Sequence, residues 1–276
     1  MSGLQEIIVV DSLAHTYPGN VEALRGINLA VRRSEVTAII GQNGSGKTTL
    51  VKHFNGLLKP TRGRVLLDGI ETKNYKPREI VRKVGYVFQN PTHQLFCTTI
   101  EEEIAFGPKN LGLQEAEIRQ RVEDAIKAFR LDRYRDIHPL RLSFPLRKML
   151  AIASVYVMHP DAVVLDEPTT GQDHIGMGLI ERTIKELKSE GRTLILVSHD
   201  MPLVAATADR AVVMRDGAIT ADAHPKEIFS NDDLMKNTHL MSPQITKLSQ
   251  MFADPRIPHN ILTVDEMYSC LEGIRK

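Results

Sequence analysis

Hydrophobic and polar positions along the chain repeat with two different periods, and each period predicts one type of element. Short apolar runs rich in β-branched residues predict buried strands, because such side chains pack well in a sheet. These runs lie at residues 6–10, 21–31, 35–40, 64–67, 84–88, 162–165 and 193–197, and a turn at 16–19 separates the first two. Strands that alternate with helical segments are typical of a parallel sheet covered by helices on both faces. The pattern therefore predicts an α/β fold.

A helical pattern prevails near the middle of the chain. From Thr99 to Asp136, apolar residues recur on one helical face with charged residues between them: Ile118, Val122, Ala125, Ile126 and Phe129. Residues 146–158 and 175–190 predict two more helices. We therefore expect a helical insertion, at about residues 90–160, between the strand-rich parts.

The last part of the chain differs from the rest in its residue pattern. Beyond His224 and Pro225, short helical segments alternate with prolines, and two of them carry apolar stripes: Ile245, Leu248 and Phe252, then Val264, Met267, Leu271 and Ile274. Thr263 and Glu266 have the spacing of a capping box. We predict a main domain over residues 1–230 and a C-terminal helical extension over 231–276. The stripes either pack on the main domain or form a dimer contact, because so short an appendage rarely forms a core alone.

Composition restricts the function without defining it. The chain has 276 residues, 42% hydrophobic and 25% charged, with a net charge of +1, which argues against nucleic acid as a partner. Cys97 and Cys270 suggest reduced thiols in the cytosol. Residues 1–5 lack a signal-peptide pattern, and no apolar run approaches the roughly 20 residues that span a bilayer. A membrane role would therefore require a partner.

The segment Gly41–Thr49 fits the phosphate-binding pattern GxxxxGK[ST], between an apolar strand and a predicted helix. Its glycines let backbone N–H groups point at phosphate oxygens, while Lys47 can bridge the outer phosphates and the Thr48 hydroxyl can ligate Mg²⁺. A glycine-rich turn that binds nothing is the alternative, which the strand-loop-helix context disfavours. The candidate contacts are Gly41, Asn43, Gly44, Ser45, Gly46, Lys47, Thr48 and Thr49.

A second chemical group follows the apolar run 162–165. Asp166 at the end of this strand can hold Mg²⁺ through water, and Glu167 can polarise the water that attacks a terminal phosphate. His199, after a later strand, can hydrogen-bond the γ-phosphate, although a lone histidine is more often structural. Together with the phosphate loop, Lys47, Glu167 and His199 are the candidate catalytic residues.

The order of these motifs resembles the ATPase subunits of ABC transporters over about residues 6–230. In that family 41–48 is the Walker A motif, Gln89 the Q-loop, 163–166 the Walker B motif, and Asp173 the end of the D-loop. The resemblance implies ATP as the nucleotide, with Tyr17 stacked on adenine and Gln89 close to Mg²⁺ alongside Thr48 and Asp166. It also implies a P-loop NTPase core, mainly parallel, with an antiparallel β subdomain, a helical insertion and a small C-terminal helical extension.

A narrower resemblance is to the energy-coupling-factor (ECF) transporter ATPases, which drive vitamin or transition-metal uptake. It rests on residues 89–96 and 99–108, with Thr92 and His93 in place of the acidic residues common there. The resemblance implies that Pro91 to Phe96 receives a transmembrane coupling subunit, beside a separate membrane substrate-binding subunit. Residues 243–248 look like the extension where two ATPase subunits touch. The expected location is peripheral, at the cytoplasmic face of the cell membrane.

One motif departs from the family. The signature Leu-Ser-Gly-Gly-Gln, which meets the partner subunit's ATP, is here Leu142-Ser143-Phe144-Pro145-Leu146. Loss of one preorganised donor to a transition-state anion costs about 2.7 to 4 kcal/mol, and Pro145 has no N–H. We therefore expect a heterodimer with a second ATPase whose signature is intact, although a homodimer is possible. The alternative is that the loop still donates through Ser143 and the helix start.

Other functions fit the sequence less well. A conventional ABC importer or exporter ATPase shares the same motifs, and a soluble non-transport ABC ATPase would carry coiled coils, zinc hooks or tandem cassettes, none of which the sequence contains. A P-loop kinase would not explain Gln89 or the His199 loop, and a nucleotide sensor would not need Glu167. The transported substrate is not encoded here, because separate membrane proteins select it in this family.

Overall fold

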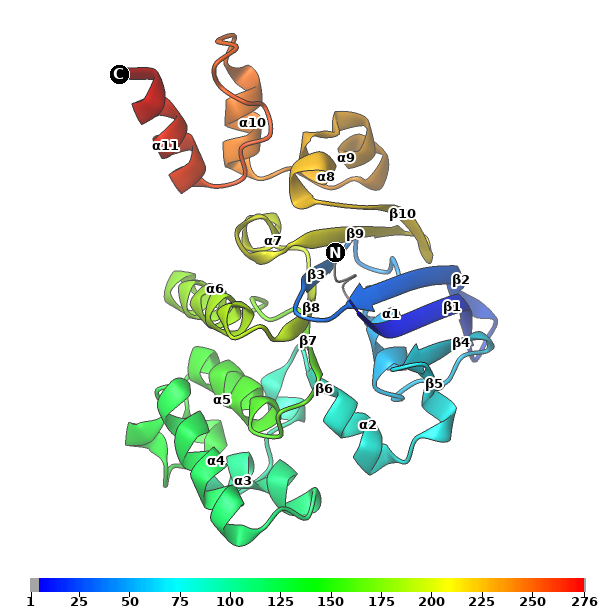
Figure 1. The fold of residues 1–276 in the computed structure, drawn as a ribbon, viewed down its shortest axis with the longest axis vertical. Coiled ribbons are helices and arrows are strands. Elements are labelled where there is room, and N and C mark those ends of the chain that lie inside the picture. Colours follow the sequence, from blue (N-terminus) through cyan, green and yellow to red (C-terminus); the bar gives the residue numbers. More distant parts are fainter. Residues whose placement is uncertain (1–4, 276) are drawn as a thin grey trace.

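Two β-sheets lie on either side of helix α1 (Lys47–Phe54) in the computed structural model, which describes residues 5–275 (Figure 1). Apolar side chains of both sheets and Leu50, Val51 and Phe54 of α1 form one buried cluster. A second cluster lies on the other face of the larger sheet, under the remaining helices. The expected lack of a signal peptide concerns residues 1–5 and so falls almost wholly outside the described range.

The smaller sheet is antiparallel, with the strand order β2-β1-β4-β5. Its strands are β1 (Glu6–Tyr17), β2 (Val21–Arg32), β4 (Arg62–Leu67) and β5 (Ile70–Glu71). The prediction that the first strand ends at residue 10 is wrong. Shifts in its register against β2 and β4 let it continue through the polar stretch that follows, with Ser12 at a φ of 50°. The turn consequently occupies 18–20 rather than 16–19.

The larger sheet has the order β10-β9-β3-β8-β7-β6 and is parallel except for β10. Successive residues of its strands face opposite ways: Ile39 and Val164 join the cluster with α1, whereas Ala38 and Leu165 join the other cluster. Its strands are β3 (Val36–Ile40), β6 (Val84–Val87), β7 (Ala162–Asp166), β8 (Thr193–Ser198), β9 (Arg210–Arg215) and β10 (Ala218–Ala223). The sequence analysis did not predict β9, β10 or the helix α7 (Met201–Thr207).

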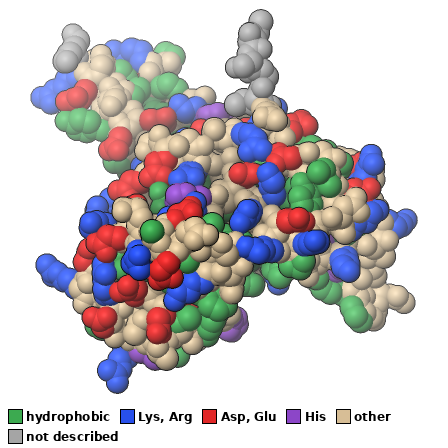
Figure 2. Space-filling model, turned by 60° about the horizontal axis from the view of Figure 1, so that its bottom comes forward, with side chains coloured by type: hydrophobic (Ala, Val, Ile, Leu, Met, Phe, Trp, Pro, Cys, Tyr) green, Lys and Arg blue, Asp and Glu red, His purple; other side chains and the backbone are tan. Residues whose placement is uncertain are grey.

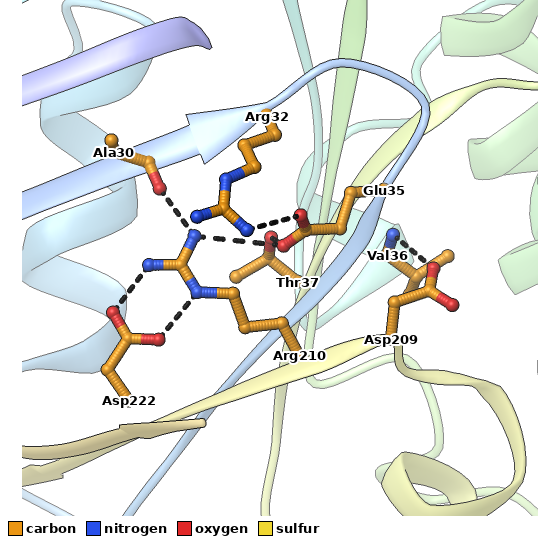
Figure 3. Close-up of polar contacts among 8 residues, drawn as sticks. All are labelled: Ala30, Arg32, Glu35, Val36, Thr37, Asp209, Arg210 and Asp222. Carbon is orange, nitrogen blue, oxygen red and sulfur yellow. Dashed lines mark hydrogen bonds and ion pairs between the residues drawn. The ribbon is translucent and has the colours of Figure 1, made fainter. Parts of the chain in front are cut away.

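A half-buried arginine connects the two sheets at the amino end of β3 (Figure 3). Arg210 donates two hydrogen bonds of 2.5 Å to Asp222 on β10 and one of 2.8 Å to the carbonyl of Ala30 on β2. Glu35 lies 3.7 Å from the same guanidinium and accepts the Thr37 hydroxyl at 2.9 Å. The rigid fork of arginine suits this pairing, which bonds three strands from two sheets.

The expected helical insertion consists of α3 (Ile100–Asn110), α4 (Glu115–Ala128) and α5 (Phe144–Tyr156), which pack on one another at the lower end in Figure 1. Helix α5 begins two residues earlier than the predicted residue 146. Pro145 is tolerated there because N–H groups in the first turn of a helix have no intrahelical acceptor. Helix α2 (Pro77–Lys83) directly precedes β6.

The final helices divide into two groups. Helices α8 (Pro225–Ser230) and α9 (Asp232–Thr238) lie against β9 and β10, and their apolar residues join the main cluster. Helices α10 (Gln244–Met251) and α11 (Val264–Arg275) instead project from the body, around a small cluster of Ile257, Ile261 and Met267 (Figure 1). Within residues 5–275, no helix combines the length and hydropathy that crossing a membrane requires.

Candidate nucleotide site

The sheet topology brings the three chemical motifs to one edge. The phosphate loop follows β3, Glu167 follows β7, and His199 follows β8, which lies between these two strands. Ile40 pairs with Ser198, and Asp166 pairs with Val197 on the other side of the same strand. Loops at the carboxyl ends of adjacent parallel strands meet, which is where open α/β sheets bind ligands.

The phosphate loop has the backbone that an anion site requires. Gly44 and Gly46 have φ values of 83° and 100°, and a Cβ atom on Gly46 would lie only 2.7 Å from the carbonyl oxygen of Ala23. Helix α1 starts directly afterwards, so its N-terminal N–H groups face the loop. The Ser45 hydroxyl is buried without a hydrogen-bond partner in the described structure. These features fit bound phosphate oxygens.

Lys47 lies across this loop. Its Nζ donates to the carbonyl oxygens of Gly41 and Gln42 at 2.7 and 2.9 Å. Burial lowers the pKa of Lys47, while the negative charges of Glu167 and Asp166 act in the opposite direction. A cation enclosed by a loop and two carboxylates is suited to the outer phosphates of a nucleotide.

Oxygen donors suited to Mg²⁺ gather beside the lysine. The Thr48 hydroxyl donates to Asp166 Oδ1 at 3.1 Å, and the Tyr86 hydroxyl donates to Asp166 Oδ2 at 2.6 Å. Burial and the Asp166 charge raise the pKa of Tyr86, which keeps its hydroxyl a donor. Mg²⁺ is bound by such hydroxyl and carboxylate oxygens together with water. Sequence reasoning missed Tyr86, because it lies inside an apolar strand.

Glu167 and His199 form a direct pair. Glu167 Oε2 lies 2.6 Å from His199 Nδ1; the carboxylate is buried, and 59% of the histidine side chain is exposed. Glu167 has a φ of 46°, a left-handed conformation held by its N–H bond to the carbonyl of Val197 at 2.9 Å. A buried carboxylate oriented by an imidazole is the arrangement of a general base with its orienting group.

Tyr17 lies at the end of β1, beside the phosphate loop. Its hydroxyl is 3.2 Å from Thr49 Oγ1, and its ring packs edge-on against His15, at 4.7 Å between centroids. His15 Nδ1 is in turn 3.2 Å from Nε2 of the fully buried His53. The sequence analysis singled out neither histidine, since nothing in their local pattern marks them. Their buried pair supports the position of Tyr17.

A cavity of about 350 Å³ joins most of the predicted residues. Its lining includes Tyr17, Asn43, Gly44, Gly46, Lys47, Thr48, Thr49, Gln89 and Glu167. Gly41 and Ser45 belong to the phosphate loop and Asp166 ends strand β7, but none of the three lines this cavity. His199 reaches the site through Glu167 and lines a second cavity of about 810 Å³, which extends to the C-terminal helices.

Two residues of the altered signature segment contact other parts of their own chain. A Cβ atom on Gly171 would lie 3.1 Å from the Phe144 ring, and one on Gly176 would lie 3.2 Å from Pro145 Cβ. Phe144 and Pro145 therefore pack on the D-loop and on helix α6 (His174–Ser189), whose first turn is capped by Asp173. The sequence analysis did not predict these contacts, because they depend on how two distant loops meet.

Comparisons with known proteins show the family of the chain. The family model described as ABC transporter matches residues 24–170. The energy-coupling factor transporter ATP-binding protein EcfA2 of Clostridium tetani is 42% identical over 270 residues, which cover 94% of each chain. A longer protein of Caldanaerobacter subterraneus, named as a putative ABC transporter ATP-binding protein, is 41% identical over 264 residues. These residues cover 96% of this chain and 46% of that protein.

Solved structures of ATP-binding subunits of ABC transporters have a similar fold. The structure of cbiO1 from Clostridium perfringens, described as part of the ABC transporter complex cbiONQ, superposes with a TM-score of 0.76. It is 37% identical and covers 89% of this chain and 99% of its own. The chain belongs to the ATP-binding subunits of ABC transporters, with ECF transporter ATP-binding proteins among its relatives at about 40% identity. It is an enzyme that couples ATP hydrolysis to transport.

Proposed function

We propose that the chain powers solute uptake by an ECF-type membrane transporter, as a peripheral subunit at the cytoplasmic face of the cell membrane. The observation that carries this proposal is the meeting of the phosphate loop, Asp166 and the Glu167–His199 pair at one sheet edge. The similarity to ECF transporter ATP-binding proteins supports the type of transporter.

Each residue of the site has a role that follows from its position. Lys47 neutralises the outer phosphates, and the buried carboxylate of Glu167 accepts a proton from the attacking water while His199 fixes its orientation. Thr48, Asp166 and Gln89 would hold Mg²⁺, which supplies positive charge between the phosphates. Tyr17, which lines the same cavity, would stack on the adenine ring.

The groove near Pro91 to Phe96 supports a membrane partner. A cavity of about 320 Å³ lies there, and Phe96 and Phe106 at its edge are 62% and 43% exposed, with their rings in edge contact at 4.7 Å. Glu103 accepts the N–H groups of Phe96 and Cys97, both at 2.8 Å, which fixes this rim. Figure 2 faces this end of the molecule and shows hydrophobic side chains gathered between charged ones. Such a groove suits the apolar face of a coupling helix.

The signature segment supports a heterodimer. Phe144 and Pro145 are the first residues of α5 and pack on their own chain, and Pro145 has no N–H, so this segment would offer fewer donors to a partner's nucleotide. A homodimer would carry two such segments, whereas a different ATPase with an intact signature would complete the Walker site of this chain. The projecting helices α10 and α11 leave Leu248, Met251 and Tyr268 exposed, which suits a contact between the two ATPase subunits through the extension at 231–276.

The asymmetry can be tested in the assembled transporter by substituting the catalytic glutamate of each ATPase separately. Glu167→Gln in this chain should abolish most ATP turnover, because it disables the site that meets the intact signature. The equivalent substitution in the partner should remove only a small part. Equal losses from the two substitutions would refute the asymmetry.

The partners themselves can be identified by affinity purification from solubilised membranes, followed by mass spectrometry. We expect a second ATPase, a coupling subunit and a separate substrate-binding membrane protein. Recovery of this chain with only copies of itself would contradict the heterodimer. Recovery with a conventional pair of transporter domains would instead indicate an ordinary ABC importer or exporter.

A further inference from the structure

A buried lysine in the signature helix has no part in the chemistry described so far. Lys148, in the second turn of α5, is fully buried, which is rare for a lysine. Its Nζ donates to two main-chain carbonyl oxygens, those of Phe88 at 3.1 Å and Gln89 at 2.5 Å. One ammonium group thus connects the signature helix with the Q-loop of the same chain.

The two carbonyl groups stand in a special relation to Gln89. The Phe88 carbonyl belongs to the peptide plane that precedes the Gln89 Cα atom, and the Gln89 carbonyl belongs to the plane that follows it. Because peptide planes are rigid, fixing both of them fixes the two backbone dihedral angles of Gln89. The direction in which its side chain leaves the backbone is thereby fixed as well.

A second contact ties the same segment to α5. The side-chain amide of Gln94 accepts the N–H of Phe88 at 3.2 Å and donates to the Ala151 carbonyl at 2.8 Å and the Ser154 hydroxyl at 3.1 Å. The segment from 88 to 94 is therefore bonded to the helix at two points, one turn apart. Lys148 is the point nearest to the nucleotide cavity, which Gln89 lines.

The charge of this lysine carries an energetic cost. Burial lowers the pKa of Lys148 to about 8, while the charges of Asp166 and Glu167 act in the opposite direction. A neutral apolar side chain of similar length would avoid the cost of desolvation. A long cationic donor at this position is explained by the two carbonyl groups that it holds beside the site.

We propose that Lys148 is a positioning residue, which fixes the backbone at Gln89 and so directs the Gln89 amide toward the metal held by Thr48 and Asp166. The proposal rests on the assignment of Gln89 to the metal in the proposed function. It gives the signature helix of this chain a task within its own Walker site, in addition to the weakened contact with the partner.

The test compares Lys148→Met, Gln89→Ala and the double variant in the assembled complex. Metal affinity is measured directly, by Mn²⁺ electron paramagnetic resonance with ATP bound and with the catalytic glutamate replaced (Glu167→Gln). We expect Gln89→Ala and Lys148→Met each to weaken Mn²⁺ binding about tenfold. This is the lower end of the loss in affinity that follows mutation of groups that orient a metal ligand. The double variant should bind as weakly as Gln89→Ala alone, because Lys148 acts through Gln89.

Lys188→Met is the matched control. Lys188 also donates from a helix to a main-chain carbonyl, that of Thr207 at 3.1 Å, but does not line the nucleotide cavity. This variant should bind Mn²⁺ like the parent complex, even where its melting temperature falls. If Lys148→Met does not fold, Lys148→Gln replaces it, since the shorter amide cannot reach both carbonyl groups.

The outcomes separate the two proposals. An effect of Gln89→Ala without an effect of Lys148→Met refutes the positioning role alone. An additive loss in the double variant refutes it too, because Lys148 would then act independently of Gln89. Unchanged Mn²⁺ binding in Gln89→Ala refutes the metal role of Gln89, on which the proposal rests. It does not bear on the proposed role of Glu167 in ATP hydrolysis.

Discussion

The phosphate loop and the signature segment are built alike and differ in the residues that they place at the start of a helix. Each leads a chain segment into the N-terminus of a helix, α1 in one case and α5 in the other. The first has glycines and a buried serine without a hydrogen-bond partner in residues 5–275, whereas the second has Phe144 and Pro145, which contact the D-loop and α6. An anion site requires available backbone N–H groups as well as a helix dipole, and Pro145 has no N–H.

The signature segment also shows how an altered sequence can keep the local fold. Pro145 lies at a position where the missing N–H has no intrahelical acceptor, and Ser143 before it is in extended conformation. Helix α5 consequently stays intact, with its apolar residues in the main cluster, although Pro145 offers no N–H in its first turn. The following substitutions test this contrast, from the largest expected effect to the smallest.

Lys47→Met should have the largest effect, because it removes the central cation of the intact phosphate site. We expect ATP turnover of the assembled complex to fall about 10²- to 10³-fold, as for loss of one transition-state donor. Lys52→Met, on the same helix, is the control and should leave turnover unchanged. Turnover of Lys47→Met within threefold of the parent would contradict the role of Lys47.

Restoring the signature should produce a gain of function. In a chain whose own site is disabled by Glu167→Gln, the combined changes Phe144→Gly, Pro145→Gly and Leu146→Gln should raise the residual turnover about 10- to 100-fold, at the partner's site. The control places the same three changes opposite a partner with a disabled catalytic glutamate, where turnover should not change. No gain in the first complex would show that the segment is not the limiting element.

Tyr86→Phe should have an intermediate effect on the phosphate side of the comparison. It removes the hydrogen bond to Asp166, so we expect about a tenfold increase in the Mg²⁺ concentration for half-maximal turnover. Tyr75→Phe, which loses a bond of 2.9 Å to the Leu67 carbonyl, should reduce stability without changing this concentration. Identical Mg²⁺ curves for the two variants would refute the role of Tyr86.

Gly171→Ala should have the smallest effect, on the signature side. The residue has a φ of 74° and faces the Phe144 ring, so we expect the free energy of unfolding to fall by about 1–2 kcal/mol. Gly178→Ala in helix α6 meets no atom within 4 Å and should raise it by roughly 0.5–1 kcal/mol. Denaturant titration distinguishes the two, and an unchanged value for Gly171→Ala would show that the loop adapts freely.

Sequence patterns predicted the elements and site residues that a local pattern marks, and missed the residues whose roles depend on contacts between distant segments. Apolar runs and the loop that follows each of them located the strands β3, β7 and β8 with their chemical residues, and the helical spacing located the insertion. The hairpin of β9 and β10 had a signal that went unused, an apolar run before Asp216-Gly217. Tyr86, Lys148 and the His15–His53 pair had none, because buried polar residues acquire their roles only from tertiary contacts.

The strained backbone at Glu167 has a consequence for laboratory evolution. A non-glycine residue in the left-handed region costs about 1–2 kcal/mol, so glycine at this position would relax the chain. A library of variants sorted only for resistance to heat would therefore enrich Glu167→Gly, which lacks the carboxylate. Such a screen would select against the carboxylate that we propose as general base, so sorting for stability here has to be paired with sorting for ATP turnover.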